Sequence, residues 1–316
     1  MANLIEVKHL KKYFETPKGL LHAVDDVSFH IKAGQTMGVV GESGCGKSTL
    51  GRTLIHLLDS TGGTIFFEGK DVTHVNAKQL YDLRADMQII FQDPYSSVNP
   101  RMTVEQTISE PLLISGRFSK KELEEETERL MDMVGVDRRL RLAYPHELDG
   151  GRRQRVGIGR ALALNPKFVV CDEPVSALDV SIQAQILNLL KSLQKELGLT
   201  YIFITHDLSV VKYFADDIGV MYLGQMVEKA SSADIFAEPL HPYTKALLSA
   251  VPVPVVGQER RKRQLIRGEI TSPVNLPDEC RFCSRCDESQ EAVCRAGNPP
   301  LREVKVGHFV ACARLN

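Results

Sequence analysis

The 316-residue sequence lacks several features that would place it in a class at once. No apolar run approaches the about 18 residues that mark a membrane-spanning helix, and residues 1–7 contain no charged segment followed by an apolar one. Neither sign of charge is in surplus, because 39 Lys and Arg stand against 40 Asp and Glu, so no general basic surface calls for nucleic acid. We therefore expect a cytosolic protein, or one held at a membrane by other proteins, with no nucleic-acid partner.

Cysteine is scarce until residue 280, since only Cys45 and Cys171 precede it. The remaining five, Cys280, Cys283, Cys286, Cys294 and Cys312, lie in the last 37 residues. In a reducing compartment such a group indicates a metal or cluster site more than disulfides, and thiolates suit Zn²⁺ or an iron–sulfur cluster. Free thiols in a small tail are the alternative. A metal there would have a structural role, because too few apolar residues surround the cysteines to build a core.

The most specific pattern is Gly-Glu-Ser-Gly-Cys-Gly-Lys-Ser-Thr at residues 41–49, between an apolar run and a helical pattern over 50–58. This is the phosphate-binding loop G-x-x-x-x-G-K-S, whose glycines let backbone N–H groups turn toward an anion. Lys47 can reach the β- and γ-phosphates of a nucleoside triphosphate, and the Ser48 hydroxyl can ligate Mg²⁺. The predicted ATP-binding residues of the loop are Gly41, Glu42, Ser43, Gly44, Cys45, Gly46, Lys47, Ser48 and Thr49.

Polar residues at the ends of later strand-like runs supply the rest of an ATPase site. Phe168–Cys171 leads into Asp172, which suits a Mg²⁺ shell, and into Glu173, which can orient or deprotonate a water molecule. Gln92 follows Met87–Phe91 and is a candidate ligand of Mg²⁺ or water, and His206 follows the run Tyr201–Ile204. We predict Glu173, His206 and Gln92 as catalytic residues and Ser48, Gln92 and Asp172 as Mg²⁺ ligands.

Strand and helix patterns alternate along the chain and predict an α/β fold with a mainly parallel core sheet. Residues 4–69 are β-rich, and a helical region over about residues 93–165 is inserted, in which Ser119–Glu122 is a capping box. Further strand-like runs include Ile218–Tyr222. After residue 250 a Pro-containing stretch and the basic run 260–263 predict a linker, so we expect an ATPase domain at 1–250 and a linker with a Cys-rich tail at 251–316.

Together these segments resemble the ATP-binding cassette (ABC) family of transport ATPases over nearly the whole chain. The resemblance implies that Tyr13 stacks on adenine, that 41–49 is the Walker A loop, and that Phe168–Glu173 is the Walker B strand with Glu173 as catalytic base. It makes Gln92 the Q-loop glutamine and His206 the switch histidine. The implied D-loop is Ser176, Ala177, Leu178 and Asp179. The family pairs two such subunits head to tail, with each ATP between the Walker A loop of one and the signature loop of the other.

Other stretches resemble the ATPase subunits of oligopeptide and dipeptide importers. They are Ile90–Tyr95, Asp172–Asp179, Val220–Gly224 and His241–Ser249. Two further stretches, Gly51–Leu54 and Tyr144–Glu147, are more similar to the second, "F" type of subunit. The resemblance implies a heterodimer with a second ABC ATPase, two membrane permeases, an extracytoplasmic binding protein and a place at the cytoplasmic face of the inner membrane. It also implies a 4Fe–4S cluster, with Zn²⁺ as the alternative, on Cys280, Cys286, Cys294 and Cys312.

One departure concerns the family signature Leu-Ser-Gly-Gly-Gln, which here reads Leu148, Asp149, Gly150, Gly151 and Arg152. Asp caps a helix as well as Ser does, so folding should survive. A carboxylate about 4 Å from a phosphate charge would be repelled by about 4 kcal/mol at an effective dielectric constant of about 20, unless Arg152 pairs with it. We therefore expect a degenerate, impaired half-site. A catalytically silent assembly subunit and a soluble, non-transport ABC ATPase remain the alternatives.

Overall fold

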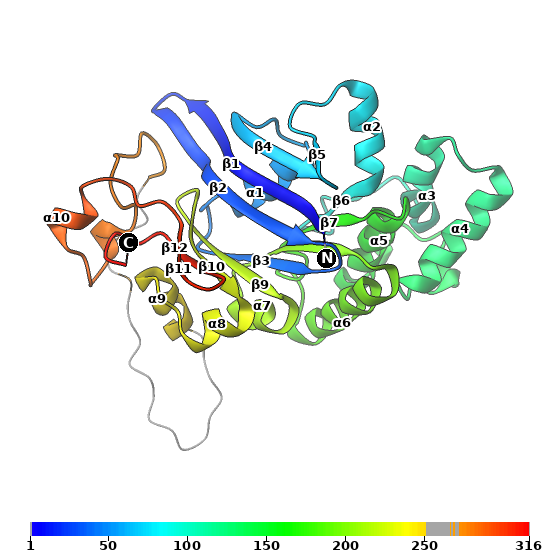
Figure 1. Cartoon of the computed structure of the whole chain (residues 1–316). Coiled ribbons are helices and arrows are strands. Elements are labelled where there is room, and N and C mark those ends of the chain that lie inside the picture. Colours follow the sequence, from blue (N-terminus) through cyan, green and yellow to red (C-terminus); the bar gives the residue numbers. More distant parts are fainter. Residues whose placement is uncertain (1, 251–265, 267, 269–271, 316) are drawn as a thin grey trace, which may run out of the picture. The chain divides into compact units, whose positions relative to one another are not determined.

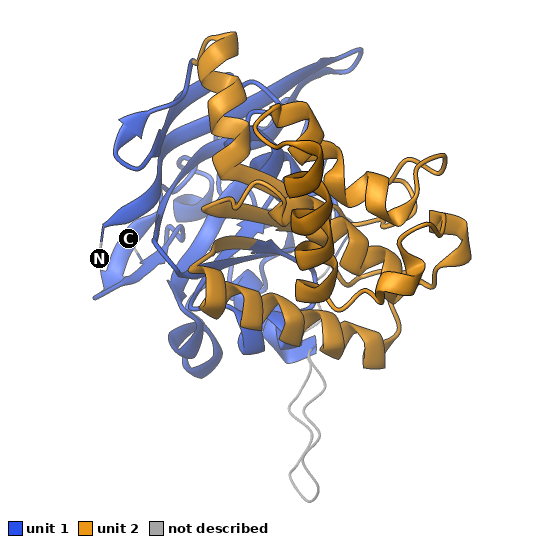
Figure 2. Ribbon diagram, turned by 90° about the vertical axis from the view of Figure 1, so that its right-hand side faces the viewer, with its two compact units in different colours: residues 1–74, 203–316 blue, residues 75–202 orange. Residues whose placement is uncertain are grey.

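The computed structural model describes residues 2–250, 266, 268 and 272–315 (Figure 1). By contacts the chain divides into two compact units (Figure 2), the first made of residues 1–74 and 203–316 and the second of residues 75–202. The predicted boundary at 250/251, the start of the linker and the basic run 260–263 lie outside the described residues.

The first unit begins with an antiparallel sheet of strand order β2-β1-β4-β5. In this sheet β1 (Asn3–Thr16) pairs with both β2 (Gly19–Lys32) and β4 (Gly62–Phe67), and β5 (Lys70–Asp71) lies at the edge. Val7 and Leu10 are buried between polar neighbours, and Leu4 and Ile5 are both buried. The predicted β-rich N-terminal region is confirmed.

A second sheet of the first unit places the phosphate loop. Its strand β3 (Thr36–Val40) is buried along its whole length and pairs in parallel with β9 (Asp217–Tyr222), with Val39 opposite Gly219. Strand β10 (Gln225–Ser231) pairs antiparallel with β9. A strand apolar on both faces is typical of a parallel sheet covered on both sides. The helices of this unit before residue 251 are α1 (Lys47–Leu54), α7 (Leu208–Phe214), α8 (Ser232–Ala237) and α9 (Pro242–Ala250).

The predicted Cys-rich tail is built into the first unit. It contains a short 3-10 turn, η3 (Cys283–Arg285), then α10 (Glu291–Cys294) and the strands β11 (Arg302–Lys305) and β12 (His308–Val310). β12 pairs with β10, so that Val310 lies opposite Glu228, and the tail extends the sheet (Figure 1). The fully buried Glu228 carboxylate interacts with Nε2 of His308 at 2.6 Å. The tail therefore shares the core of the first unit.

The second unit carries the inserted helices. Its parallel strands are β6 (Met87–Ile90) and β7 (Phe168–Asp172), with Ile90 opposite Cys171. β8 (Thr200–Ile204) leads the chain from the second unit back to the first. The helices of the second unit are α2 (Ala77–Asp86), α3 (Val104–Ser115), α4 (Lys120–Met133), α5 (Gly150–Leu162) and α6 (Val180–Leu197). Two short 3-10 turns, η1 (Arg138–Leu140) and η2 (Pro145–Glu147), lie between α4 and α5. The predicted helical insertion is confirmed.

Helix α4 begins as the sequence predicts. Oγ of Ser119 accepts the N–H of Glu122 at 3.4 Å, and the Glu122 carboxylate accepts the N–H of Ser119 at 2.8 Å. This is the reciprocal capping box, which satisfies two backbone donors that a helix start leaves unpaired.

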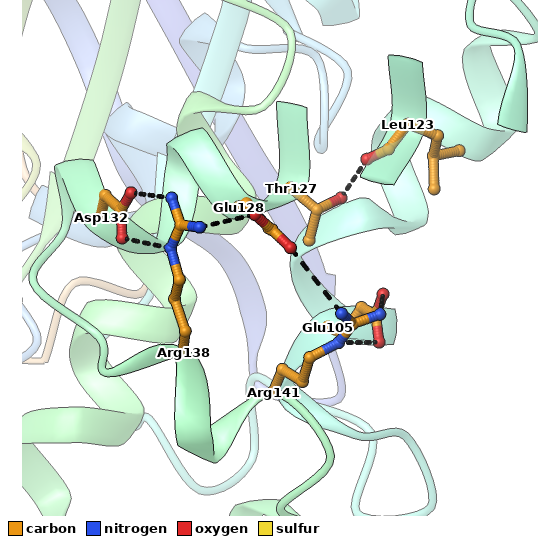
Figure 3. Close-up of polar contacts among 7 residues, drawn as sticks. All are labelled: Glu105, Leu123, Thr127, Glu128, Asp132, Arg138 and Arg141. Carbon is orange, nitrogen blue, oxygen red and sulfur yellow. Dashed lines mark hydrogen bonds and ion pairs between the residues drawn. The ribbon is translucent and has the colours of Figure 1, made fainter. Parts of the chain in front are cut away.

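Ion pairs tie α3 and α4 to the turn η1 that precedes the predicted signature loop (Figure 3). Arg138 binds Glu128 at 2.7 Å and also Asp132, and Arg141 binds Glu105 at 2.7 Å. Glu128 also faces Arg141 at 3.8 Å, which joins the two groups into one network. Single exposed pairs contribute little to stability, but a network with bidentate arginines fixes the path of this turn. Glu128 and Asp132 of α4 are therefore both paired with arginines.

Candidate functional site

The phosphate loop leaves β3 at Val40 and enters α1 at Lys47. Gly46 has φ +102°, and a Cβ there would stand 1.9 Å from the carbonyl oxygen of Ala23. A Cβ at Gly41 would stand 2.2 Å from the carbonyl oxygen of Met221. Side chains are excluded at both positions, because the backbone of the loop is pressed against neighbouring backbone. The glycines of the motif thus have a structural reason in this chain.

Lys47 is held inside the loop. Its ammonium group donates to the carbonyl oxygens of Gly41 and Glu42, both at 2.8 Å, and the residue is buried. An ammonium group fixed on a phosphate-binding loop supplies the cation that such a loop offers to a phosphate chain. Ser48 and Thr49 follow in the first turn of α1, where the backbone N–H groups lack helical partners.

Cys45 is buried beside Lys47, with its sulfur 3.8 Å from the ammonium nitrogen. Burial raises the pKa of the Cys45 thiol, so the thiol stays protonated and poorly reactive at neutral pH. Cys45 therefore acts as a small packed side chain of the loop and lacks the exposed thiolate that a redox switch needs.

Tyr13, predicted to stack on adenine, lies on β1 facing His22, and their ring centroids are 4.3 Å apart. Its hydroxyl donates to the Asp25 carboxylate, and burial together with this carboxylate raises the pKa of Tyr13. Asp25 also accepts from the His22 ring at 3.0 Å. The ring of Tyr13 is therefore fixed in orientation as a neutral phenol, while its role toward adenine stays a prediction.

His206 lies just after β8 in the first unit. It lines a cavity of about 210 Å³ together with Gly41 and Glu42 of the phosphate loop; the other lining residues are Val40, Leu208 and Leu247. The structure thus brings the predicted switch histidine next to the loop, as the sequence order required.

In the second unit, β7 ends at the buried Asp172, and Glu173 follows with φ +48°. A positive φ is costly for a residue with a Cβ and is found mainly where a side chain must be aimed. The Glu173 carboxylate accepts a hydrogen bond from Nε2 of Gln92 at 3.0 Å. Two residues predicted to act together, 81 positions apart, therefore touch.

The altered signature loop forms the start of α5. Asp149 is the N-cap, and its carboxylate accepts the N–H of Arg152 at 2.7 Å. The Arg152 side chain lies 3.4 Å from the same carboxylate, with both side chains more than half exposed. The capping and pairing weighed from the sequence are both present. Leu148, just before them, is buried.

The predicted D-loop, Ser176–Asp179, packs on this helix. A Cβ at Gly150 would lie 3.1 Å from Leu178, and a Cβ at Gly151 would lie 2.7 Å from Ile182 of α6. The two glycines therefore allow close approach. The Ser176 hydroxyl donates to the Glu173 carbonyl at 3.1 Å, Asp179 is the N-cap of α6, and Ala177 lies between them.

Sequence reasoning missed Arg153. Its buried guanidinium donates to the carbonyl oxygens of Pro145 and Leu148 at 2.6 and 2.8 Å and stacks 3.4 Å from the ring centroid of Tyr95. Arg153 thus joins the start of the signature loop to the segment after Gln92. An arginine on the buried face of an amphipathic helix was the available signal.

The predicted metal site in the tail gains no support. Cys280, Cys283 and Cys294 are buried in an apolar cluster, with Cys286 packed against it. Among the described residues, no group of three or more His, Cys, Asp or Glu side chains could hold a metal ion. Likewise, no helix in the described part of the chain is long and apolar enough to cross a membrane.

The phosphate loop at the end of a parallel strand, together with the Asp–Glu strand end, defines a P-loop ATPase. Residues 24–176 match the ABC transporter family, and residues 227–294 match the C-terminal region of oligopeptide/dipeptide transporters. The chain belongs to the ABC transporter family and is an ATPase of that family.

Relatives and solved structures agree with this. The putative oligopeptide transport ATP-binding protein YkfD of Bacillus subtilis is 50% identical, covering 98% of this chain and 94% of that protein. AppF of the same organism, an oligopeptide transport ATP-binding protein, is 47% identical over 98% and 96%. The structure of cbiO1 from Clostridium perfringens has a TM-score of 0.67 at 29% identity, covering 75% and 92%. The ATP-binding cassette MJ0796, solved as a dimer with ADP and Pi, has 0.66 at 28%, covering 72% and 98%.

Proposed function

We propose that this chain is the ATP-hydrolysing subunit that energises peptide import across the cytoplasmic membrane. The observation that carries the proposal is 50% identity over nearly the full length to a protein described as a putative oligopeptide transport ATP-binding protein, in a chain whose Walker A and Walker B residues are all present. The matched C-terminal region of oligopeptide/dipeptide transporters supports the same cargo class.

The residue roles follow from the chemistry of phosphoryl transfer. Lys47 binds the β- and γ-phosphates, and Glu173 orients or deprotonates the attacking water. Gln92, hydrogen-bonded to Glu173, holds that carboxylate in place, and His206 polarises the γ-phosphate end. The oxygens of Ser48, Asp172 and Gln92 would hold Mg²⁺, which neutralises charge on the phosphates. Tyr13 stacks on adenine.

The same proposal includes the partners. We place the chain at the cytoplasmic face of the inner membrane, in a head-to-tail heterodimer with a second ABC ATPase, on two permeases served by an extracytoplasmic binding protein. ATP closes the two ATPases and hydrolysis reopens them, which drives alternating access. We assign residues 1–250 to the ATPase domain and 251–316 to a linker and tail that packs on it. No observation favours a soluble, non-transport ATPase.

The Asp149–Arg152 pair favours a second candidate, in which the half-site formed by this signature loop is impaired or silent. Restoring the family sequence with Asp149→Ser and Arg152→Gln removes a carboxylate from where a partner's γ-phosphate would lie. We expect ATP-dependent association with the partner ATPase to tighten by up to about fivefold, because the interaction of exposed charges is screened to about 1 kcal/mol. The single change Asp149→Ser should give most of this gain if Arg152 is a bystander, and little of it if the two residues act as a pair.

That association is measured with both subunits trapped by Glu→Gln changes at their catalytic bases. Equal or weaker association of the restored form would mean that the loop is adapted to its partner, and the impaired half-site would be wrong.

The 4Fe–4S cluster on Cys280, Cys286, Cys294 and Cys312 is a separate proposal. A backbone hydrogen bond from the Cys280 N–H to the Cys294 carbonyl oxygen, at 2.9 Å, makes two of the four cysteine segments neighbours, although no group of side chains among the described residues is placed to hold a metal ion. Binding would require the side chains to turn. Protein purified without oxygen should contain iron and acid-labile sulfide at about one cluster per chain. Zinc without iron would contradict the cluster and indicate the alternative metal. The absence of any metal would also contradict it and would mean that the cysteines are packed free thiols.

The experiment that tests the proposed function is reconstitution in proteoliposomes of this chain with its partner ATPase, both permeases and the binding protein. Uptake of a labelled peptide is measured with ATP and with a non-hydrolysable analogue. Peptide uptake with ATP but not with the non-hydrolysable analogue supports the proposal. Uptake that is the same without this chain contradicts it.

A further inference from the structure

The tail contacts the phosphate loop directly through Arg285. Its guanidinium binds the Glu42 carboxylate with both nitrogens, at 2.7 Å to Oε2 and 3.1 Å to Oε1, and its side chain is only 6% exposed. It also donates to the Tyr222 hydroxyl at 3.3 Å. Glu42 is the second residue of the loop, 243 positions away in the sequence. A bidentate pair between a buried arginine and a partly buried carboxylate fixes geometry as well as charge.

Glu42 is held at each of its polar groups. Its N–H donates to the Tyr243 hydroxyl at 2.9 Å, and its carbonyl oxygen accepts from the Lys47 ammonium at 2.8 Å. Arg285 takes the carboxylate. Glu42 contacts Lys47, the residue proposed to receive the β- and γ-phosphates, through its backbone carbonyl oxygen, and it lines the same cavity as Gly41 and His206. Without a cation on it, the Glu42 carboxylate would repel those phosphates.

Aromatic packing sets the position of Arg285. The ring of Phe282, three residues earlier, lies 5.3 Å from that of Tyr222 and 5.4 Å from that of Tyr243. Both tyrosines also contact the Arg285–Glu42 pair. The Tyr222 hydroxyl accepts a hydrogen bond from Arg285, and the Tyr243 hydroxyl accepts one from the Glu42 N–H. The tail is therefore docked on the two tyrosines by apolar contact, and the docking delivers the guanidinium to the loop.

The same tail segment reaches the other end of the predicted nucleotide site. Arg281 binds the Asp25 carboxylate, which also accepts from the Tyr13 hydroxyl, and it donates to the Leu223 carbonyl oxygen. Arg281 and Arg285 are both buried side chains. Within the first unit, Arg281 thus reaches the predicted adenine-stacking residue Tyr13 through Asp25, and Arg285 reaches the phosphate loop at Glu42.

We propose that Arg285 is a positioning residue for ATP: it neutralises Glu42 and holds the phosphate loop in its binding form. The C-terminal region thereby sets the nucleotide affinity of the ATPase. This inference rests on the proposed ATP binding, and it adds a role for the tail that a purely structural extension of the sheet would not have.

The test compares the dissociation constants of ATP and ADP, measured by titration calorimetry, for four forms of the full-length chain: the parent and three variants. Arg285→Gln should weaken ATP binding about tenfold or more and ADP binding by less, because the repulsion grows with phosphate charge. Glu42→Gln combined with Arg285→Gln should recover most of the loss. Arg314→Gln, which removes an arginine paired with Glu288 elsewhere in the tail, should bind as the parent does.

Thermal unfolding without nucleotide is measured on each form, since a purely structural role predicts a lower melting temperature with no recovery in the double variant. Unchanged ATP affinity in Arg285→Gln, equal losses for ATP and ADP, or no recovery would each overturn the proposal. If Arg285→Gln fails to fold, the double variant, which buries no unpaired charge, decides alone: near-parental ATP affinity supports the proposal, and weak binding overturns it. A parent chain that binds no ATP would instead refute the proposed function.

Discussion

Lys47→Ala should abolish tight ATP binding, with the dissociation constant rising about 100-fold or more. The side chain supplies the ammonium on the inner side of the phosphate loop, and hydrogen bonds to charged groups contribute about 1.5–3 kcal/mol each. The chain should still fold, because the Lys47 ammonium contacts only loop carbonyl oxygens and the Cys45 sulfur among its described hydrogen bonds. Titration calorimetry measures the change.

A matched control is Lys121→Ala, which removes an exposed lysine of α4 in the second unit. It should bind ATP as the parent does. If Lys47→Ala binds ATP with the parental affinity, the assignment of residues 41–49 as the phosphate loop is wrong.

Glu173→Gln should keep ATP binding and slow hydrolysis about 100- to 10,000-fold at the site to which this Walker half contributes. The amide keeps the size of the side chain and can still meet Gln92, but it has no basic oxygen to activate water. Because a second site contributes to the total, the rate is measured in the complex whose partner carries its own Glu→Gln change.

Glu196→Gln, an exposed carboxylate near the end of α6, is the control and should hydrolyse ATP at the parental rate. Parental hydrolysis by Glu173→Gln in the same complex would mean that Glu173 is not the base. The ATP site to which this Walker half contributes would then be the silent one.

Local signals predicted the elements that hold the site. β3, β7 and β8 are short runs buried at every residue, and such runs stand out in a sequence because burial on both faces removes polar residues. The capping box at Ser119 was predictable because both of its hydrogen bonds lie within four residues. Boundaries were less accurate: the helical pattern over 50–58 continues past the end of α1 at Leu54.

Contacts that single polar residues of the tail make with distant segments could not be predicted. Where β12 pairs with β10, the buried Glu228 carboxylate meets His308 from 80 residues away, and a polar residue gives no apolar signal in the sequence. The Arg285–Glu42 pair could not be predicted either, because nothing in the sequence around Arg285, one of 39 Lys and Arg residues, indicates which carboxylate it binds. The roles of the site residues stay predictions, although Gln92 and Glu173 do touch.

The most direct test of the account is one rate: ATP hydrolysis by the reconstituted complex, with and without peptide-loaded binding protein. The account predicts that loaded binding protein raises the rate several-fold, and that the rise disappears when this chain carries Lys47→Ala. A rate that is unaffected by peptide, by the permeases and by Lys47→Ala would contradict the claim that this chain couples ATP hydrolysis to peptide import.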